Sequence, residues 1–136
     1  MIYIWKKDGK AYVHTDLEGA KQLDELTTQP TKTLKDDVFY RDYNGLARVI
    51  DGELVLGKTE QEVKDEKANE IRRIRDSKIE EIQWRIQRYT EQVSMGVKTT
   101  DSEENYKAVL KYVQDLRDVP KQKTFPESVV WPELTV

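Results

Sequence analysis

The sequence predicts an α+β protein, in which a small β-rich N-terminal unit precedes a long connecting helix and a C-terminal helical hairpin with an extended Pro/Trp tail. Three observations predict this fold class. Short β-branched and aromatic runs alternate with turn dipeptides over residues 1–57. Residues 58–95 contain no Gly or Pro, and three of the four prolines lie within residues 96–136. We therefore expect one N-terminal domain over 1–57, a helix over 58–95, and a second helix with its tail over 96–136.

A β-hairpin is predicted at the start of the chain. The runs 1–5 and 11–15 are rich in β-branched and aromatic residues, and Asp8-Gly9 between them suits a tight turn. A short helix is expected over 16–26, because leucine and alanine recur every three residues behind a capping Asp16. The first third of the chain thus combines strands with one helix.

Further strands are predicted before residue 57. The run Val38-Phe39-Tyr40 and the segment 46–50 have strand-like composition, and Asp51-Gly52 turns the chain into the segment 53–56. We expect all of these segments to belong to the small N-terminal unit.

The long helix has clear signals at both ends. Thr59 and Glu62 have the spacing of a capping box, and Gly96 suits a left-handed C-terminal cap. The helix spans roughly 35 residues, or about 50 Å. Its second half carries a regular apolar stripe that requires a partner face. The stripe consists of Ile79, Ile82, Ile86, Tyr89 and Val93.

A second helix is expected over 102–117, after a short loop that returns it along the first. Its apolar face can dock against the stripe of the long helix. That face consists of Tyr106, Val109, Leu110, Val113 and Leu116. Pro120 ends the helix, and the segment 120–132 is expected to be extended because it contains three prolines.

Composition argues against catalysis and against several kinds of ligand. The chain has no cysteine and a single histidine, His14, so neither a nucleophile pair nor a metal cluster is expected. The glycines occur singly, which leaves no loop to cradle a phosphate. No stretch is apolar enough to span a membrane. We expect a protein that is not an enzyme, has no cofactor or metal, and lacks a membrane segment.

The charge distribution also argues against nucleic acid as a partner. The net charge is −3, and the basic run at residues 72–75 is interleaved with acidic residues at spacings that stabilise a solvated helix. We interpret these basic side chains, together with Lys78, Arg85 and Arg88 further along, as a solvated face.

Trp84 is the first candidate for partner binding. At about 100° per residue it lies on the side of the helix opposite the apolar stripe. Either the N-terminal unit or the tail covers it, or it is an exposed anchor, since Trp, Tyr and Arg dominate interface hot spots. Tyr112 flanks the apolar face of its own helix and raises the same question.

The tail and its hinge supply the other candidates. Phe125 and Trp131 either fold back onto the hairpin and complete a small core, or form an exposed strand that the prolines stiffen for binding. Arg117 and Asp118 lie at the hinge, where they form either a charge pair or helix cap, or a contact with a partner.

The order of short motifs near the C-terminus resembles a known family. The segment Leu116-Arg117-Asp118-Val119-Pro120-Lys121-Gln122 is followed by Phe125-Pro126 and by Val129-Val130-Trp131-Pro132. This order is similar to the C-terminal region of bacteriophage tail fibre assembly proteins. The resemblance implies a chaperone that binds the distal region of the tail fibre protein and assists its folding and trimerisation. It also implies action in the host cell cytoplasm and, in some relatives, retention at the fibre tip.

One alternative belongs to a different class. A structural protein of the virion tail could self-associate through the long helix and form a homo-oligomer. The regular stripe covers only about two heptads, fewer than a sustained coiled coil shows. The sequence therefore favours the chaperone over the structural protein.

Overall fold

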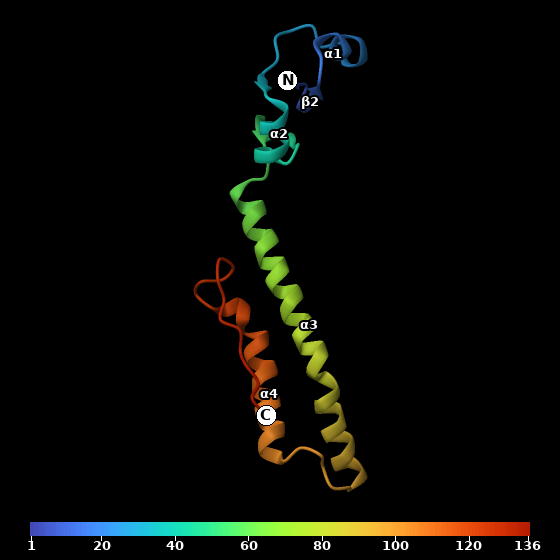
Figure 1. Cartoon of the computed structure of the whole chain (residues 1–136), viewed down its shortest axis with the longest axis vertical. Helices are drawn as coiled ribbons and strands as arrows, with labels where there is room; N and C mark the ends of the chain where they lie inside the picture. Colours follow the sequence, from blue (N-terminus) through green and yellow to red (C-terminus); the bar gives the residue numbers. More distant parts are fainter. The chain divides into compact units, whose positions relative to one another are not determined.

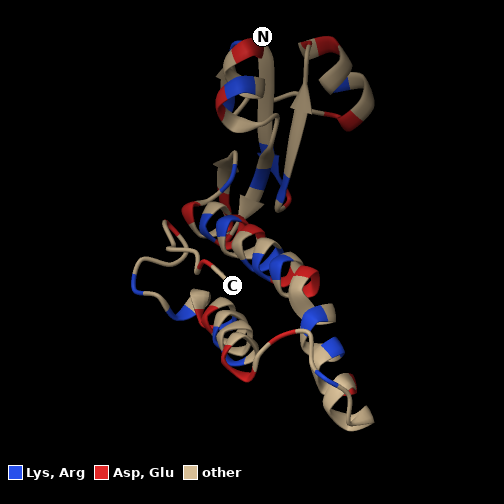
Figure 2. Ribbon diagram, turned by 60° about the horizontal axis from the view of Figure 1, so that its bottom comes forward, with Lys and Arg blue, Asp and Glu red and all other residues tan.

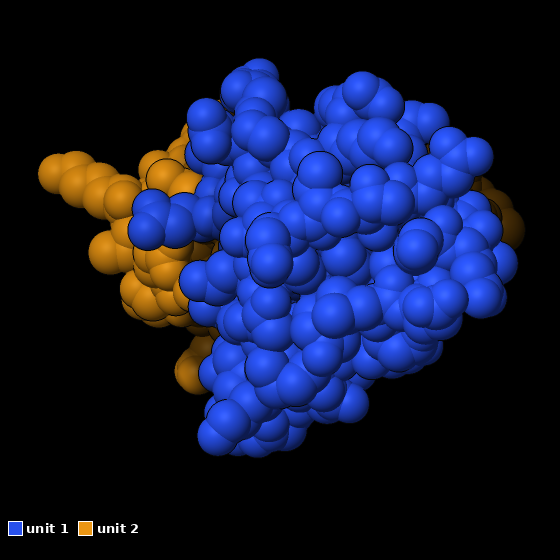
Figure 3. All heavy atoms as spheres, turned by 90° about the horizontal axis from the view of Figure 1, so that it is seen from above, with its two compact units in different colours: residues 1–62 blue, residues 63–136 orange.

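The structure, a computed structural model, describes residues 1–136 and has an α+β element order, which confirms the predicted fold class. Two compact units, Met1–Glu62 and Val63–Val136, divide the chain (Figure 3). The strands are β1 Ile2–Lys7, β2 Lys10–His14, β3 Lys32–Leu34, β4 Ala47–Ile50 and β5 Glu53–Leu56. The helices are α1 Leu17–Asp24, α2 Asp36–Tyr43, α3 Glu60–Met95 and α4 Glu103–Arg117, with a 3₁₀ turn, η1, at Val119–Lys121.

The first unit contains two small antiparallel sheets. One has the strand order β2-β1-β3, and the other pairs β4 with β5. The predicted hairpin turns are confirmed: Asp8 and Gly9 have φ values of 53° and 74°, and Asp51 and Gly52 have 52° and 79°. Left-handed φ at both central residues is the geometry that matches the twist of two hairpin strands. The short strand β3 was not predicted from the sequence.

The strand predicted at Val38-Phe39-Tyr40 is wrong, because these residues lie in helix α2. The helix places Phe39 and Tyr43 one turn apart on the side that packs against the core, whereas Tyr40 is exposed. Asp36 and Asp37 in the first turn complement the helix dipole. Tertiary packing of one aromatic side chain therefore outweighs a local preference for strand.

Strand β1 supplies the cores on both faces of its sheet, because successive side chains of a strand point to opposite faces. Ile2 and Ile4 pack with Phe39 on one face, and all three are at most 1% exposed. On the other face Trp5 is 2% exposed and packs with Ala20 of α1 and Leu26. Alternation along β1 thus joins the two sheets and α1 in a single unit.

The ends of helix α3 lie where the sequence predicts them. Thr59 and Glu62 form the capping box: each backbone N–H donates to the other side chain, at 3.0 and 3.1 Å. Gly96, with φ of 69°, follows the last helical residue. Among the 36 residues of α3 only Ala68 is buried. A helix this exposed is not fixed in place by apolar burial alone.

Helix α4 returns along α3 after the loop 96–102 (Figure 1). Ser102 caps it by accepting a hydrogen bond from the backbone N–H of Asn105. Tyr106 stacks on Tyr89 of α3 with ring centroids 3.9 Å apart, which confirms that the two helices dock. The docking face is narrower than predicted, because Val93 and Leu110 are 55% and 39% exposed. The fully buried row on this side is Val109, Val113, Leu116 and Val119.

The prediction of an extended chain over 120–132 is wrong for residues 120–127. These residues complete η1 and form a bend and a series of turns, and the chain has no assigned secondary structure or turn only from residue 128 onward. Pro120 occupies an early position of η1, where its missing N–H has no partner to lose. Proline therefore ends α4 without making the chain extend at once, and the tail then turns back along α4 (Figure 1).

Candidate partner-binding surface

One face of α3 holds the tail through cationic side chains. Lys78 and Arg85 follow Lys67 by about three and five helical turns, so all three lie on one face. Lys67 forms an ion pair with Glu127 at 2.8 Å, and the Lys78 ammonium lies 5.5 Å from the ring centroid of Trp131. The Arg85 guanidinium donates a hydrogen bond of 2.7 Å to the backbone oxygen of Val136. The final residues therefore run parallel to α3.

The lengths of helix and tail agree with this arrangement. Helix residues 67–85 span about 27 Å at 1.5 Å per residue. Tail residues 127–136 span about 28 Å at 3.1 Å per residue in an extended conformation. A cation can therefore meet the tail at its beginning, middle and end.

Two further contacts fix the tail where it turns. The guanidinium of Arg72 lies 5.3 Å from the ring centroid of Phe125, a cation–π arrangement. The Gln122 side chain donates to the backbone oxygen of Val130 and accepts from its N–H, both at 2.8 Å. Phe125 and Trp131 are half-buried. Of the two arrangements that the sequence left open for these rings, the structure has the one that folds back onto the hairpin.

Asp101 joins the loop to the same face of α3. Its carboxylate, 8% exposed, accepts two hydrogen bonds of 2.8 Å from Arg85 and one of 3.2 Å from Arg88. The hydrogen bonds from Arg85, more than those from Arg88, hold the pKa of Asp101 below its ordinary value. The interpretation of the basic residues as merely solvated is therefore wrong for Arg72, Lys78 and Arg85. Their partners come from distant parts of the chain.

The outer face of α3, opposite the apolar stripe, presents Trp84, which is 56% exposed. Arg88, one turn further, places its guanidinium 4.9 Å from the Trp84 ring centroid. Met95, about three turns beyond Trp84, shares this face and is 67% exposed. Acidic residues outnumber basic ones on this side of α3. Figure 2 shows how acidic and basic residues alternate along the helix. The acidic residues of this face are Glu66, Glu70, Glu80, Glu81 and Glu91.

A comparison with known protein families gives a match to this part of the chain. The family model described as phage tail assembly chaperone protein matches residues 68–134. This segment is similar to the phage tail assembly chaperone family. The match confirms the resemblance found at the C-terminal motifs, at the level of tail assembly. No curated protein and no solved structure matches the chain.

Most of the motif residues of the chaperone segment are used in its own fold. Leu116 and Val119 are fully buried, Gln122 clamps Val130, and Pro126 is buried. This explains why the C-terminal motif was the strongest signal in the sequence. These motif residues therefore contribute to the folding of the tail.

The six candidate residues of the chaperone segment do not form one site. Trp84 lies on the outer face of α3, and Arg117 is exposed at the end of α4, where Tyr112 is half-buried. Asp118 accepts hydrogen bonds from Gln114 and pairs with Lys121 at 3.3 Å. The remaining candidates, Phe125 and Trp131, contact α3 as described above.

Asp118 and Trp131 nevertheless meet at a pocket of about 290 Å³ between the end of α4 and the tail. The sequence indicated both residues as candidates but could not predict that they meet. The pocket is lined by Asp115, Asp118, Gln122, Val130, Trp131 and Pro132.

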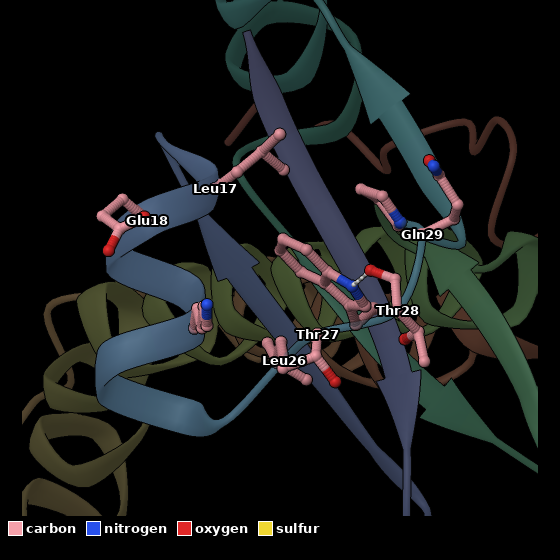
Figure 4. A pocket seen from close by; sticks show the side chains of 9 residues that line it. Leu17, Glu18, Leu26, Thr27, Thr28 and Gln29 are labelled. Atoms are coloured by element: carbon pink, nitrogen blue, oxygen red, sulfur yellow. Dashed lines mark hydrogen bonds between the residues drawn. The ribbon is translucent and has the colours of Figure 1, made fainter.

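Unit 1 lies wholly outside the family match and has a pocket of its own. This pocket, of about 380 Å³, lies beside the buried ring of Trp5, between α1 and the segment 26–30 (Figure 4). The Trp5 indole N–H donates a hydrogen bond of 3.1 Å to the backbone oxygen of Thr28, which fixes one wall. Glu18 and Lys21 place opposite charges on the α1 wall. The mixed rim indicates no single ligand chemistry.

The chain has neither a cluster of potential metal ligands nor a helix that could cross a membrane. No group of three or more His, Asp or Glu side chains is placed to hold a metal ion. None of the helices has both the length and the apolar surface that crossing a membrane requires.

Proposed function

We propose that this protein is a non-catalytic tail fibre assembly chaperone. It binds the distal region of a phage tail fibre protein in the host cytoplasm and assists the folding and trimerisation of that protein, its client. The family of residues 68–134 supports a role in tail assembly, and the C-terminal motifs support the fibre as the client. A complex that outlasts assembly would leave the chaperone at the fibre tip.

Exposure of Trp84 is the observation that carries the proposal. A large aromatic side chain that is 56% exposed on a regular helix has no role in the core of its own chain. Trp and Arg are enriched among residues that dominate interface energy, and Arg88 lies against the Trp84 ring. Because the helix already orders the backbone around this pair, little conformational entropy is lost when a partner covers it.

Co-expression with the fibre protein tests the proposal. We expect the wild-type chain to raise the yield of soluble fibre trimer and to co-purify with it. Trp84→Ala should keep the wild-type circular dichroism and thermal transition but weaken the complex at least about tenfold, as loss of a hot-spot residue does. If the fibre protein trimerises and stays soluble equally well without this chain, the proposal is wrong.

Val93→Ala is the matched control for Trp84→Ala. Val93 is 55% exposed, nearly the same fraction as Trp84. At about 100° per residue, it lies on the other side of α3. The control should bind the fibre like the wild type. Equal losses in the two variants would show that α3 as a whole, and not the Trp84 face, determines binding.

Self-association through α3, as a structural tail protein would require, is opposed by charge. Glu80, Glu81 and Glu91 surround Trp84 on the outer face, so two copies that pair there bring like charges together. Sedimentation of the isolated chain separates the two functions. A chaperone is expected as a small species, and a large oligomer that persists on dilution would favour the structural protein.

A further inference from the structure

The pocket between α4 and the tail combines an apolar wall with an acidic rim. Val130, Trp131 and Pro132 of the tail form the wall. Asp115 and Asp118 at the end of α4 form the rim, and Gln122 lies between the two sets. The volume of about 290 Å³ suits one long side chain rather than a peptide segment.

The wall is held in place before any partner arrives. Gln122 fixes the backbone of Val130 with two hydrogen bonds of 2.8 Å, and Lys78 of α3 lies against the Trp131 ring. The side chain of Val130 is nevertheless 78% exposed, so it is free to contact an incoming group. A site that is already ordered loses little entropy on binding.

The rim carries two negative charges that are only loosely neutralised. Asp115 pairs with Lys111 and Asp118 with Lys121, but these lysines are 77% and 80% exposed. Exposed ion pairs of this kind contribute little free energy, so each carboxylate can readily exchange its lysine for a better partner. Hydrogen bonds from Gln114 and then from Lys121 hold the pKa of Asp118 below its ordinary value, so its carboxylate is ionised at neutral pH.

We propose that this pocket binds one arginine side chain of the client protein. The apolar stem of the arginine lies along Trp131 and Val130, and its planar guanidinium reaches the carboxylates of the rim. Charge complementarity selects this occupant, because an apolar side chain would leave the carboxylates without a new partner and an acidic one would be repelled. That the arginine comes from the client rests on the proposed function. That the pocket recognises an arginine side chain does not.

The indole N–H signals of the three tryptophans provide a direct test by NMR on the full chain. The probe is the peptide acetyl-Gly-Arg-Gly-amide, and its control replaces arginine with citrulline, which has the same shape without the charge. We expect the arginine peptide to move the Trp131 signal and to leave those of Trp5 and Trp84 unchanged. The citrulline peptide should bind about two- to fivefold more weakly, the effect of losing one exposed charge pair.

Two sets of variants should change the affinity for the arginine peptide in opposite directions. Asp115→Asn with Asp118→Asn keeps the shape of the rim, and it should weaken the arginine peptide about fivefold or more. Lys121→Met releases Asp118 from its lysine and should tighten binding about twofold. Unchanged circular dichroism shows that each variant is folded, and the Lys121 variant tests the proposal even if the asparagine pair disturbs the end of α4.

The proposal is overturned if citrulline binds as well as arginine, if the Trp131 signal does not move, or if Lys121→Met weakens binding. These results are separable from those on the proposed function. Peptide recognition without any effect of the chain on fibre assembly would refute the chaperone function and leave the pocket intact. Fibre assembly that depends on the chain, with no recognition of the arginine peptide, would refute only the pocket.

Discussion

The two compact units of this chain are stabilised by different interactions. Unit 1 has an apolar cluster on each face of β1, around Phe39 on one side and Trp5 on the other. Unit 2 has one buried apolar row, on α4 and η1, while α3 holds the tail and the loop mainly with cations such as Lys78 and Arg85. A chain in which 36% of residues are charged can therefore fold its second half by using charged side chains as structural contacts.

The largest effect is expected in unit 1. Phe39 is 1% exposed, and Phe39→Ala should lower the free energy of unfolding of this unit by about 3–5 kcal/mol, because it leaves a cavity between α2 and β1. Amide hydrogen exchange, followed residue by residue, should show the loss in unit 1 and not in α4. Leu23→Ala, at a position that is 77% exposed, is the control and should change stability by less than about 0.5 kcal/mol. Equal losses of protection in both units would contradict the separation between them.

The next effect concerns the charged node of unit 2. Asp101→Ala removes a carboxylate that accepts hydrogen bonds from both Arg85 and Arg88. The two guanidinium groups then lose their shared ion-pair partner. We expect a loss of about 2–3 kcal/mol in unit 2, the range for hydrogen bonds between charged groups. Chemical denaturation of the variant measures it. Asp76→Asn, which alters a carboxylate that is 66% exposed, should have almost no effect.

A smaller effect is expected at the start of α3, within unit 1. Thr59→Ala removes one half of the capping box with Glu62 and should cost about 1 kcal/mol. Thermal unfolding followed by circular dichroism measures the cost. Thr100→Ala, in the loop before α4, is the control. It removes only an exposed hydrogen bond that the Thr100 hydroxyl accepts from the Gln92 side chain, and it should have a smaller effect.

The carboxylate of Glu62 makes the stability of unit 1 depend on pH. A hydrogen bond from Arg48, and then one from the Thr59 backbone, lower the pKa of Glu62 from 4.5 to about 2. Because the pKa is lower in the folded state, the contribution is complete above about pH 4.5 and is lost as the pH falls towards 2. Glu62→Gln should therefore flatten the decline in thermal stability across this interval. An identical decline in the variant would show that other carboxylates dominate.

The smallest effect tests the cations that hold the tail. Lys78→Met keeps a side chain of similar length but removes the charge that lies over Trp131. We expect a cost of about 0.5–1 kcal/mol, together with faster hydrogen exchange in residues 128–136. The wild-type tail should also lose protection at high salt, whereas the Phe39 cluster should not. A tail that is insensitive to both changes would mean that burial alone holds it.

The sequence could predict which side of its helix a single residue occupies, but not which residues lie together. The position of Trp84 relative to the apolar stripe follows from helical periodicity, and its exposure agrees with it. The meeting of Asp118 with Trp131 at one pocket has no such signal, because it depends on where the tail turns after Pro120. The one hint in the sequence is Gln122, because a glutamine side chain can pair with the backbone of an extended segment.

The sequence by itself determined the features that arise within about one helical turn or one hairpin. Asp8-Gly9 sets a turn, Thr59 with Glu62 begins α3, and Gly96 ends it, because each acts on backbone groups only a few residues away. Only the tertiary structure decided that α2 is a helix, which faces of α3 are covered, and where the tail lies. Contacts such as that of Lys67 with Glu127 join residues 60 apart, and no local pattern encodes them. Their free energy is gained only once the chain has closed that distance.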